Sequence, residues 1–102
     1  MIYLISRHTG AIEWSQQQGL HVDCVVSHLD DLPIQAEDVV IGTLPLHLAA
    51  EVQARGARYL HLSLDVPFKW RGQELTCEQM QQAGAHLQEF QISRIPCRLN
   101  LR

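Results

Sequence analysis

The stretch LISRHTGAIEW, residues 4–14, decides the fold, because an apolar run there gives way to polar groups and then to a helical pattern. Residues 2–5 are β-branched, aromatic and leucine side chains, which is typical of a strand. The side chains directly after that strand are Ser6, Arg7 and His8. Thr9 predicts the cap of a helix that runs to about Gln18 and ends at Gly19. In an open α/β sheet, ligands bind beyond the carboxyl ends of the strands, so these polar residues are the first candidates for a site.

The chain repeats this alternation of strand and helix. Further strands are predicted at Val22–Val26, Val39–Ile41 and Arg58–Leu64. The segment SHLDDLP, residues 27–33, is predicted to be a loop, because it combines aspartates with a proline. Thr43 predicts the cap of a second helix, with Pro45 in the first turn, that runs to about Arg55 and stops at Gly56.

The last third of the chain starts with a predicted loop, Val66–Leu75. Thr76 and Gln79 then match a capping box, which predicts the start of a third helix. An apolar stripe at helical spacing predicts that this helix continues as far as Phe90; its members are Met80, Ala83, Leu87 and Phe90. The tail from Ser93, broken by Pro96, is expected to be either a short edge strand or a disordered end.

This order of elements favours an α/β fold with a mainly parallel sheet flanked by helices. If the first and third strands lie side by side, the strand order reverses between them and leaves a crevice at their carboxyl ends. Ser6, Arg7 and His8 would then face Gly42–Leu44 across that crevice. The domain organisation expected is one domain over residues 1–92 and a tail over 93–102.

Composition narrows the class of protein. The formal net charge is −3, so the whole molecule presents no field that would attract long nucleic acid. The cysteines are widely spaced and odd in number, which suits a reducing cytoplasm better than a disulfide framework; they are Cys24, Cys77 and Cys97. The apolar run before Arg7 is too short for a signal peptide or a membrane span. We therefore expect a cytoplasmic protein with no membrane segment.

The residue types at the crevice indicate that its ligand is an anion. Arg7 offers a planar fork of donors for a phosphate, and two helix N-termini would point amides at the same place. His8 can transfer a proton, with His28 or His47 as a partner. The candidate catalytic residues are Arg7, His8, His28 and His47. The candidate substrate-binding residues are Ser6, Thr9, Gly42, Thr43, Leu44, Ser63, Lys69, Trp70 and Arg71. The histidines lack the spacing of a metal site, so neither a metal nor another cofactor is expected.

Structural interpretations of the same residues stay open. Arg7 could pair with Glu13 or Asp30, and GTLP could be nothing more than a well-formed helix start. Trp70 could stack on a base or anchor a subunit interface. LISRHTG also looks like the Arg–His–Gly signature of histidine phosphatases, but a threonine intervenes before the glycine and the chain is short for that fold.

A closer resemblance comes from four motifs read together: SRHTGAIEW (6–14), VVSHLD (25–30), VIGTLPLHLAAEVQARGARYLHLSLDVP (40–67) and RGQEL (71–75). In this order they resemble a small CRISPR-associated accessory family of type III systems, similar to the ring nucleases that linearise cyclic oligoadenylates. The match spans about Ile2 to Phe90.

The resemblance implies a Rossmann-like (CARF-like) domain that works as a homodimer on cyclic tetra-adenylate. Its implied reaction is metal-independent attack by a ribose 2′-hydroxyl, which gives linear di-adenylate with 2′,3′-cyclic phosphate ends and switches off type III signalling. Two competing functions remain open: a sponge or sensor that binds the same ligand without cleaving it, and an interaction module in which Arg7 and His8 are structural and Trp70 marks a partner surface.

Overall fold

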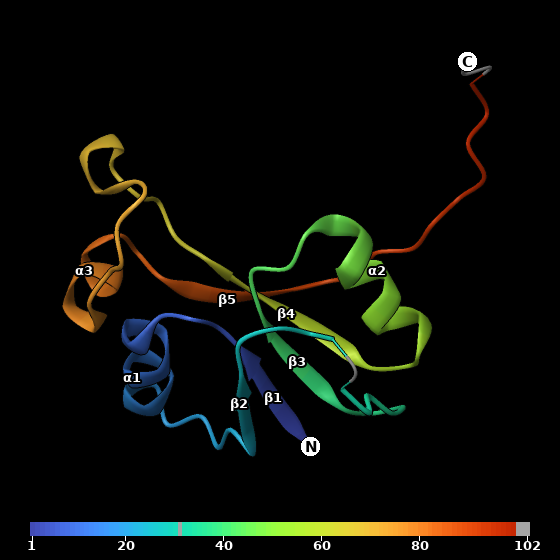
Figure 1. The fold of residues 1–102 in the computed structure, drawn as a ribbon, viewed down its shortest axis with the longest axis horizontal. Helices are drawn as coiled ribbons and strands as arrows, with labels where there is room; N and C mark the ends of the chain where they lie inside the picture. Colours follow the sequence, from blue (N-terminus) through green and yellow to red (C-terminus); the bar gives the residue numbers. More distant parts are fainter. Residues whose placement is uncertain (31, 100–102) are drawn as a thin grey trace.

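The sheet has the mainly parallel arrangement that the sequence predicts. In the computed structural model, which describes residues 1–30 and 32–99, five strands lie in the order β2-β1-β3-β4-β5 (Figure 1). Their bounds are Ile2–Ile5 (β1), Cys24–Val26 (β2), Val39–Gly42 (β3), Arg58–Ser63 (β4) and His86–Phe90 (β5). The first four strands are parallel, and β5 runs antiparallel to β4. The α/β class is confirmed, and the order is compatible with a Rossmann-like fold.

Helices cover both faces of this sheet. Figure 1 shows α1 (Thr9–Gln17) and α3 (Cys77–Gln82) together on one side and α2 (Leu46–Ala54) on the other. Each side has its own buried cluster. The α2 cluster includes Tyr3, Ile5, Val40, Val52 and Tyr59. The α1–α3 cluster comprises Ala11, Trp14, Leu62, Cys77 and Met80. Alternate residues of the strands therefore serve opposite cores, as the two-residue period of a strand requires.

β1 lies beside β3, the arrangement on which the expected crevice depends. Ile5 pairs with Gly42 across this parallel pair, while Ile5 pairs with Val26 on its other side. β1 therefore lies inside the sheet between β2 and β3, and the strand order reverses between β1 and β3. A crevice outside the carboxyl ends of these two strands is where this class of sheet binds ligands.

The third helix is shorter than the apolar stripe predicts. The capping box at Thr76 and Gln79 is present in both of its hydrogen bonds, but α3 ends at Gln82. Gly84 follows with a φ of +74°, a left-handed conformation that ends a helix and is favourable for glycine. Leu87 and Phe90, predicted to be helical, lie in β5 and pair with β4. The prediction of a helix to Phe90 is therefore wrong.

Neither Thr9 nor Thr43 caps the helix that it was expected to start. The N-caps are His8 for α1 and Pro45 for α2, and neither makes a side-chain capping bond. β2 is also shorter than predicted and begins at Cys24; the preceding Asp23 bonds Ile2 twice, its amide donating to the Ile2 carbonyl and its carboxylate accepting from the Ile2 amide. The predicted loop 66–75 contains one short 3₁₀ turn, η1 (Phe68–Trp70).

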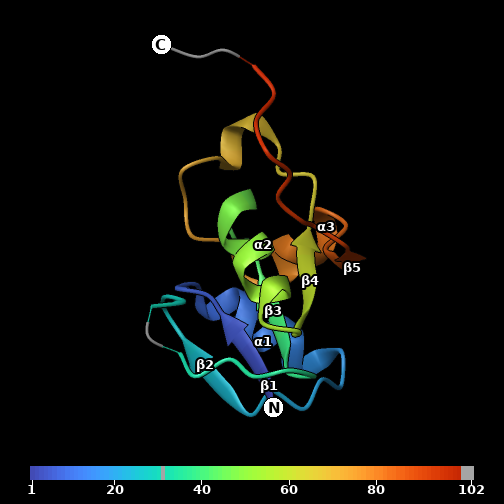
Figure 2. The same ribbon diagram turned by 90° about the vertical axis from the view of Figure 1, so that its right-hand side faces the viewer.

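The segment after β5 leaves the sheet. Residues 93–99 have no regular secondary structure: Ser93 and Arg94 still lie beside α2, and Figures 1 and 2 both show the chain beyond them running away from the body of the fold. No strand forms over these described tail residues. Asp31 of the predicted loop and residues 100–102 of the predicted tail lie outside the described residues. Over the described ranges, no helix is long and apolar enough to cross a membrane.

Candidate functional site

Two cavities adjoin at the carboxyl ends of β1 and β3. The first, of about 340 Å³, is here called the Arg7 cavity; its polar lining includes Ser6, Arg7, His8, His28, Asp30 and Thr43. The second, of about 490 Å³, is here called the Trp70 cavity and reaches under the loop that carries η1. Four residues line both cavities: Ile5, Ser6, His8 and Thr43. The sequence-predicted crevice is therefore present as one site with two compartments.

Strand pairing fixes the two polar segments that meet in this site. Ser6 follows Ile5 directly, and its amide donates to the carbonyl of Val26 at 2.9 Å. Opposite it, a Cβ at Gly42 would lie 2.9 Å from the carbonyl oxygen of Ile5, which is closer than side-chain carbons approach. Glycine at the end of β3 thus permits the close approach that brings Thr43 near Ser6.

His8 lies at the boundary between the compartments. The Ser6 hydroxyl accepts a hydrogen bond from the His8 amide at 3.1 Å, which forms a tight turn before α1. Arg7, between them, is exposed and lines only the Arg7 cavity. His28 follows β2 and lines that same cavity. Three catalytic candidates, Arg7, His8 and His28, therefore lie around one cavity although they come from two strand ends.

The Trp70 cavity is apolar at its base and polar at its rim. Its apolar lining includes Leu4, Ala11, Leu62, Leu64, Leu75 and Met80. Half-buried Trp70 forms part of the wall, and exposed Arg71 and Gln73 stand beside it. An apolar slot with an aromatic wall and a few polar groups suits a planar heterocycle such as a nucleobase.

Four predicted site residues lie outside this arrangement. The His47 and Lys69 side chains are exposed and line neither cavity. Ser63 donates its hydroxyl hydrogen to Gln88 of β5 at 2.8 Å. The Thr9 amide and hydroxyl both donate to the carboxylate of Glu74, at 3.3 and 3.2 Å. This carboxylate therefore occupies the N-terminal end of α1, where the sequence had indicated amides free for a phosphate.

Sequence reasoning missed a buried hydroxyl beside the site. Tyr59 of β4 is 1% exposed, and its hydroxyl accepts from the Leu44 amide at 2.8 Å. The same oxygen lies 3.1 Å from the carbonyl oxygen of Gly42 and 2.7 Å from Nδ1 of His61. Burial raises the pKa of the Tyr59 hydroxyl, so it stays a hydrogen-bond donor. The available signal was a tyrosine in a strand of the core, because a buried tyrosine hydroxyl needs a partner.

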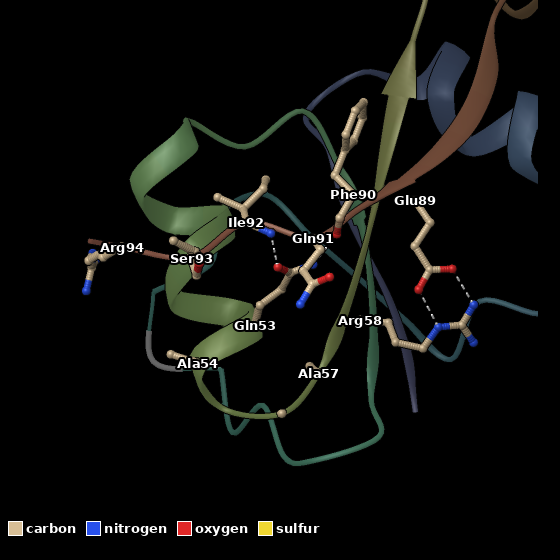
Figure 3. A pocket seen from close by; sticks show the side chains of 12 residues that line it. Gln53, Ala54, Ala57, Arg58, Glu89, Phe90, Gln91, Ile92, Ser93 and Arg94 are labelled. Atoms are coloured by element: carbon tan, nitrogen blue, oxygen red, sulfur yellow. Dashed lines mark hydrogen bonds and ion pairs between the residues drawn. The ribbon is translucent and has the colours of Figure 1, made fainter.

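A third hollow lies elsewhere, and polar groups of its lining make structural contacts. It measures about 740 Å³ and lies between α2, the start of β4 and residues 89–94 (Figure 3). The Gln53 side-chain amide bonds the backbone of Phe90 and Ile92, while Arg58 and Glu89 form a two-pronged ion pair at 2.7 and 2.8 Å. These contacts attach β5 and the residues after it to α2 and β4. We therefore interpret the hollow as structural.

No three histidine, cysteine or acidic side chains gather in a way that could hold a metal ion within residues 1–30 and 32–99.

The comparisons with known proteins add one match. Residues 3–93 match the model of a family described as "Putative CRISPR-associated protein (Cas_VVA1548)". No curated protein and no solved structure matches the chain.

Proposed function

The chain belongs to the CRISPR-associated family Cas_VVA1548, and from this premise we propose that it is a metal-independent ring nuclease of type III CRISPR defence. The proposed substrate is cyclic tetra-adenylate, and the proposed products are linear di-adenylates with 2′,3′-cyclic phosphate ends. Destroying this signal in the cytoplasm would switch off the effector nucleases that it activates.

One observation carries the proposal: a polar compartment that contains Arg7 and an apolar aromatic compartment share a wall that includes His8. A nucleotide presents the same two chemistries next to each other, a charged phosphodiester and a flat base. Arg7 suits the phosphate because its guanidinium is planar and keeps its charge. Trp70 suits the base because stacking on an aromatic face works for any nucleobase and is worth about 1–3 kcal/mol.

The reaction needs no external nucleophile. The ribose 2′-oxygen attacks the adjacent phosphorus, the bond from phosphorus to the 5′-oxygen breaks, and the 5′-oxygen leaves with a proton. Holding the attacking and leaving oxygens in line can supply up to ~7–11 kcal/mol of the barrier. Arg7 would stabilise the negative charge that develops on the phosphoryl oxygens. His8 would move a proton, with His28, which lines the same Arg7 cavity, as its partner.

A homodimer would match the symmetry of the substrate. A cyclic tetranucleotide has approximate two-fold symmetry, so two copies could each present one Arg7 cavity and one Trp70 cavity to it. Two cuts at opposite linkages would release two di-adenylates. We propose this dimer as the active form.

A binding protein without turnover is the second candidate. Two observations support it. Arg7, His8 and His28 are exposed, and within the described ranges no hydrogen bond joins their side chains. A catalytic pair that is not assembled before the ligand arrives is compatible with a sponge. Turnover separates the two candidates.

The test is chromatography of cyclic tetra-adenylate after incubation with the purified protein. Ligand is supplied in at least tenfold excess, because only conversion of more ring than protein shows that each protein molecule cleaves repeatedly. Parallel reactions contain a chelator. Complete conversion to di-adenylate in the presence of chelator supports the nuclease. An intact ring that co-elutes with the protein supports the sponge, and an intact ring that elutes alone refutes both.

A further inference from the structure

The hydroxyl of Tyr59 lies where it can control the shape of the site without touching a ligand. It bonds the carbonyl of Gly42 and the amide of Leu44, and these two groups flank Thr43 on either side. Thr43 itself is exposed and lines both the Arg7 cavity and the Trp70 cavity. One buried side chain from β4 therefore holds the backbone of a residue that separates the two compartments.

The hydrogen-bond inventory makes His61 part of this clamp. A phenol has one hydrogen to give and two lone pairs to receive. Its oxygen receives the Leu44 amide hydrogen, so its own hydrogen goes either to the Gly42 carbonyl or to Nδ1 of His61. When Nδ1 of His61 carries a hydrogen, the imidazole donates to the phenol and the phenol donates to Gly42. All three bonds then exist together.

The geometry keeps His61 in place for this role. His61 lies two residues after Tyr59 on the same face of β4, and its ring packs edge-on against Phe90 of β5 at 6.0 Å between centroids. The ring is partly exposed, whereas the Tyr59 hydroxyl is not. A short chain of hydrogen bonds thus runs from a half-buried imidazole on β4 to the turn after β3.

We propose that Tyr59 and His61 are positioning residues that fix the backbone around Thr43, and so keep the Arg7 and Trp70 cavities aligned for a nucleotide. Neither residue lines the two cavities, so neither is expected to contact substrate. The inference rests on the proposed function for its activity measurement, but its structural part can be tested without any ligand.

The first experiment compares two buried tyrosines. Tyr59→Phe removes the hydroxyl at the site, and Tyr3→Phe removes a hydroxyl from a tyrosine of the same buried cluster, which donates to the sulfur of Met1 at 3.5 Å. We expect Tyr59→Phe to lower kcat for ring cleavage roughly 10- to 100-fold with a smaller change in KM, as a displaced catalytic group would. Tyr3→Phe is expected to keep the wild-type kcat. Equal kcat values for the two variants would overturn the proposal.

The second experiment uses His61. His61→Leu removes the donor to the Tyr59 hydroxyl, whereas the side-chain amide of His61→Asn can still donate from nearly the same position. We expect the leucine variant to lose kcat and the asparagine variant to recover most of it. If both lose the same activity, His61 has no part in the clamp.

Amide hydrogen exchange separates failure of this inference from failure of the proposed function. Loss of the Tyr59 hydroxyl should speed exchange of the Leu44 amide roughly tenfold, the effect of one hydrogen bond, and Tyr3→Phe should leave it unchanged. If the wild-type protein cleaves no ring but this difference is seen, the nuclease proposal fails and the clamp stands. Unchanged Leu44 exchange in Tyr59→Phe refutes the clamp whatever the activity.

Discussion

Replacing Gly10 with alanine gives a stability change whose sign depends on one close contact. Alanine is favoured over glycine inside a helix by about 0.8–1.0 kcal/mol, so helix propensity alone predicts that Gly10→Ala stabilises α1. A Cβ at residue 10, however, would lie 2.0 Å from the carbonyl oxygen of Leu75 and 2.9 Å from the carbonyl carbon of Thr76. Both atoms belong to the backbone, so no side-chain rotation can relieve the contact.

The contact decides the result. Main-chain atoms would have to move by about 1 Å to reach the closest separation that side-chain carbons tolerate, and crowding against rigid backbone falls in the upper part of the usual range for overpacking, about 2–3 kcal/mol. After the gain in helix propensity is subtracted, we expect the free energy of unfolding to fall by about 1–2 kcal/mol. The Tm should then be lower by roughly 4–16 °C. Leu75 also lines the Trp70 cavity, so the variant should bind cyclic tetra-adenylate more weakly.

Thermal unfolding followed by circular dichroism measures the change. Gln16→Ala is the control, because it adds alanine to the exposed face of the same helix and should stay within about 0.5 kcal/mol of wild type. A Gly10→Ala protein with an unchanged or higher Tm would refute the close packing of α1 on the segment before α3.

Three further changes test the site and the pH response. His8→Ala should lower kcat roughly 10²–10⁴-fold and leave ligand affinity nearly unchanged, whereas Arg7→Ala should lower both; single-turnover assays and calorimetry measure the two quantities. Trp70→Ala should weaken binding by about 1–3 kcal/mol in the same calorimetry, and Trp70→Phe should restore much of it. The Gln35 amide and the N-terminal ammonium bond the Asp38 carboxylate and hold its pKa below 3.8, its ordinary value. The contribution of Asp38 to the free energy of unfolding is therefore complete above pH 3.8 and is lost as the pH falls through the lower pKa of the folded state. In Asp38→Asn, the free energy of unfolding should depend less on pH in this acid range.

Local signals in the sequence predicted most of the fold. β1, β3 and β4 are short apolar runs followed by polar or glycine residues, and their placement needed only the pattern. The capping box at Thr76 was predicted correctly because both of its bonds lie within four residues. The switch point between β1 and β3 followed from connectivity.

The errors arose where distant partners or one glycine override local periodicity. The helical spacing of apolar residues predicted that Leu87 and Phe90 belong to a helix. The left-handed Gly84 instead turns the chain back, so that both residues lie in β5 and pair with β4. Thr9 resembles a cap, yet its hydroxyl bonds Glu74, which is 65 residues away in the sequence. No local pattern contains that contact.

The site was predicted in the same uneven way. Arg7, His8 and Thr43 were placed correctly around the crevice, because the carboxyl ends of parallel strands meet at one edge. His47 was chosen for its position in a first turn, but its exposed side chain lines neither cavity. The Tyr59 clamp was missed because it depends on which carbonyl and amide lie above a buried phenol, which requires coordinates.

The cluster around Trp14 has a consequence for how the protein is made. Ala11 and Trp14 are synthesised well before Cys77 and Met80, which cover them and follow more than 60 residues later in the chain. A nascent chain that ends near residue 63 can supply all four parallel strands and still expose the Trp14 face to water. Such a surface attracts chaperones and other nascent chains. We therefore expect folding to complete only after translation of α3, and chains arrested before residue 77 to keep the Trp14 face open to solvent.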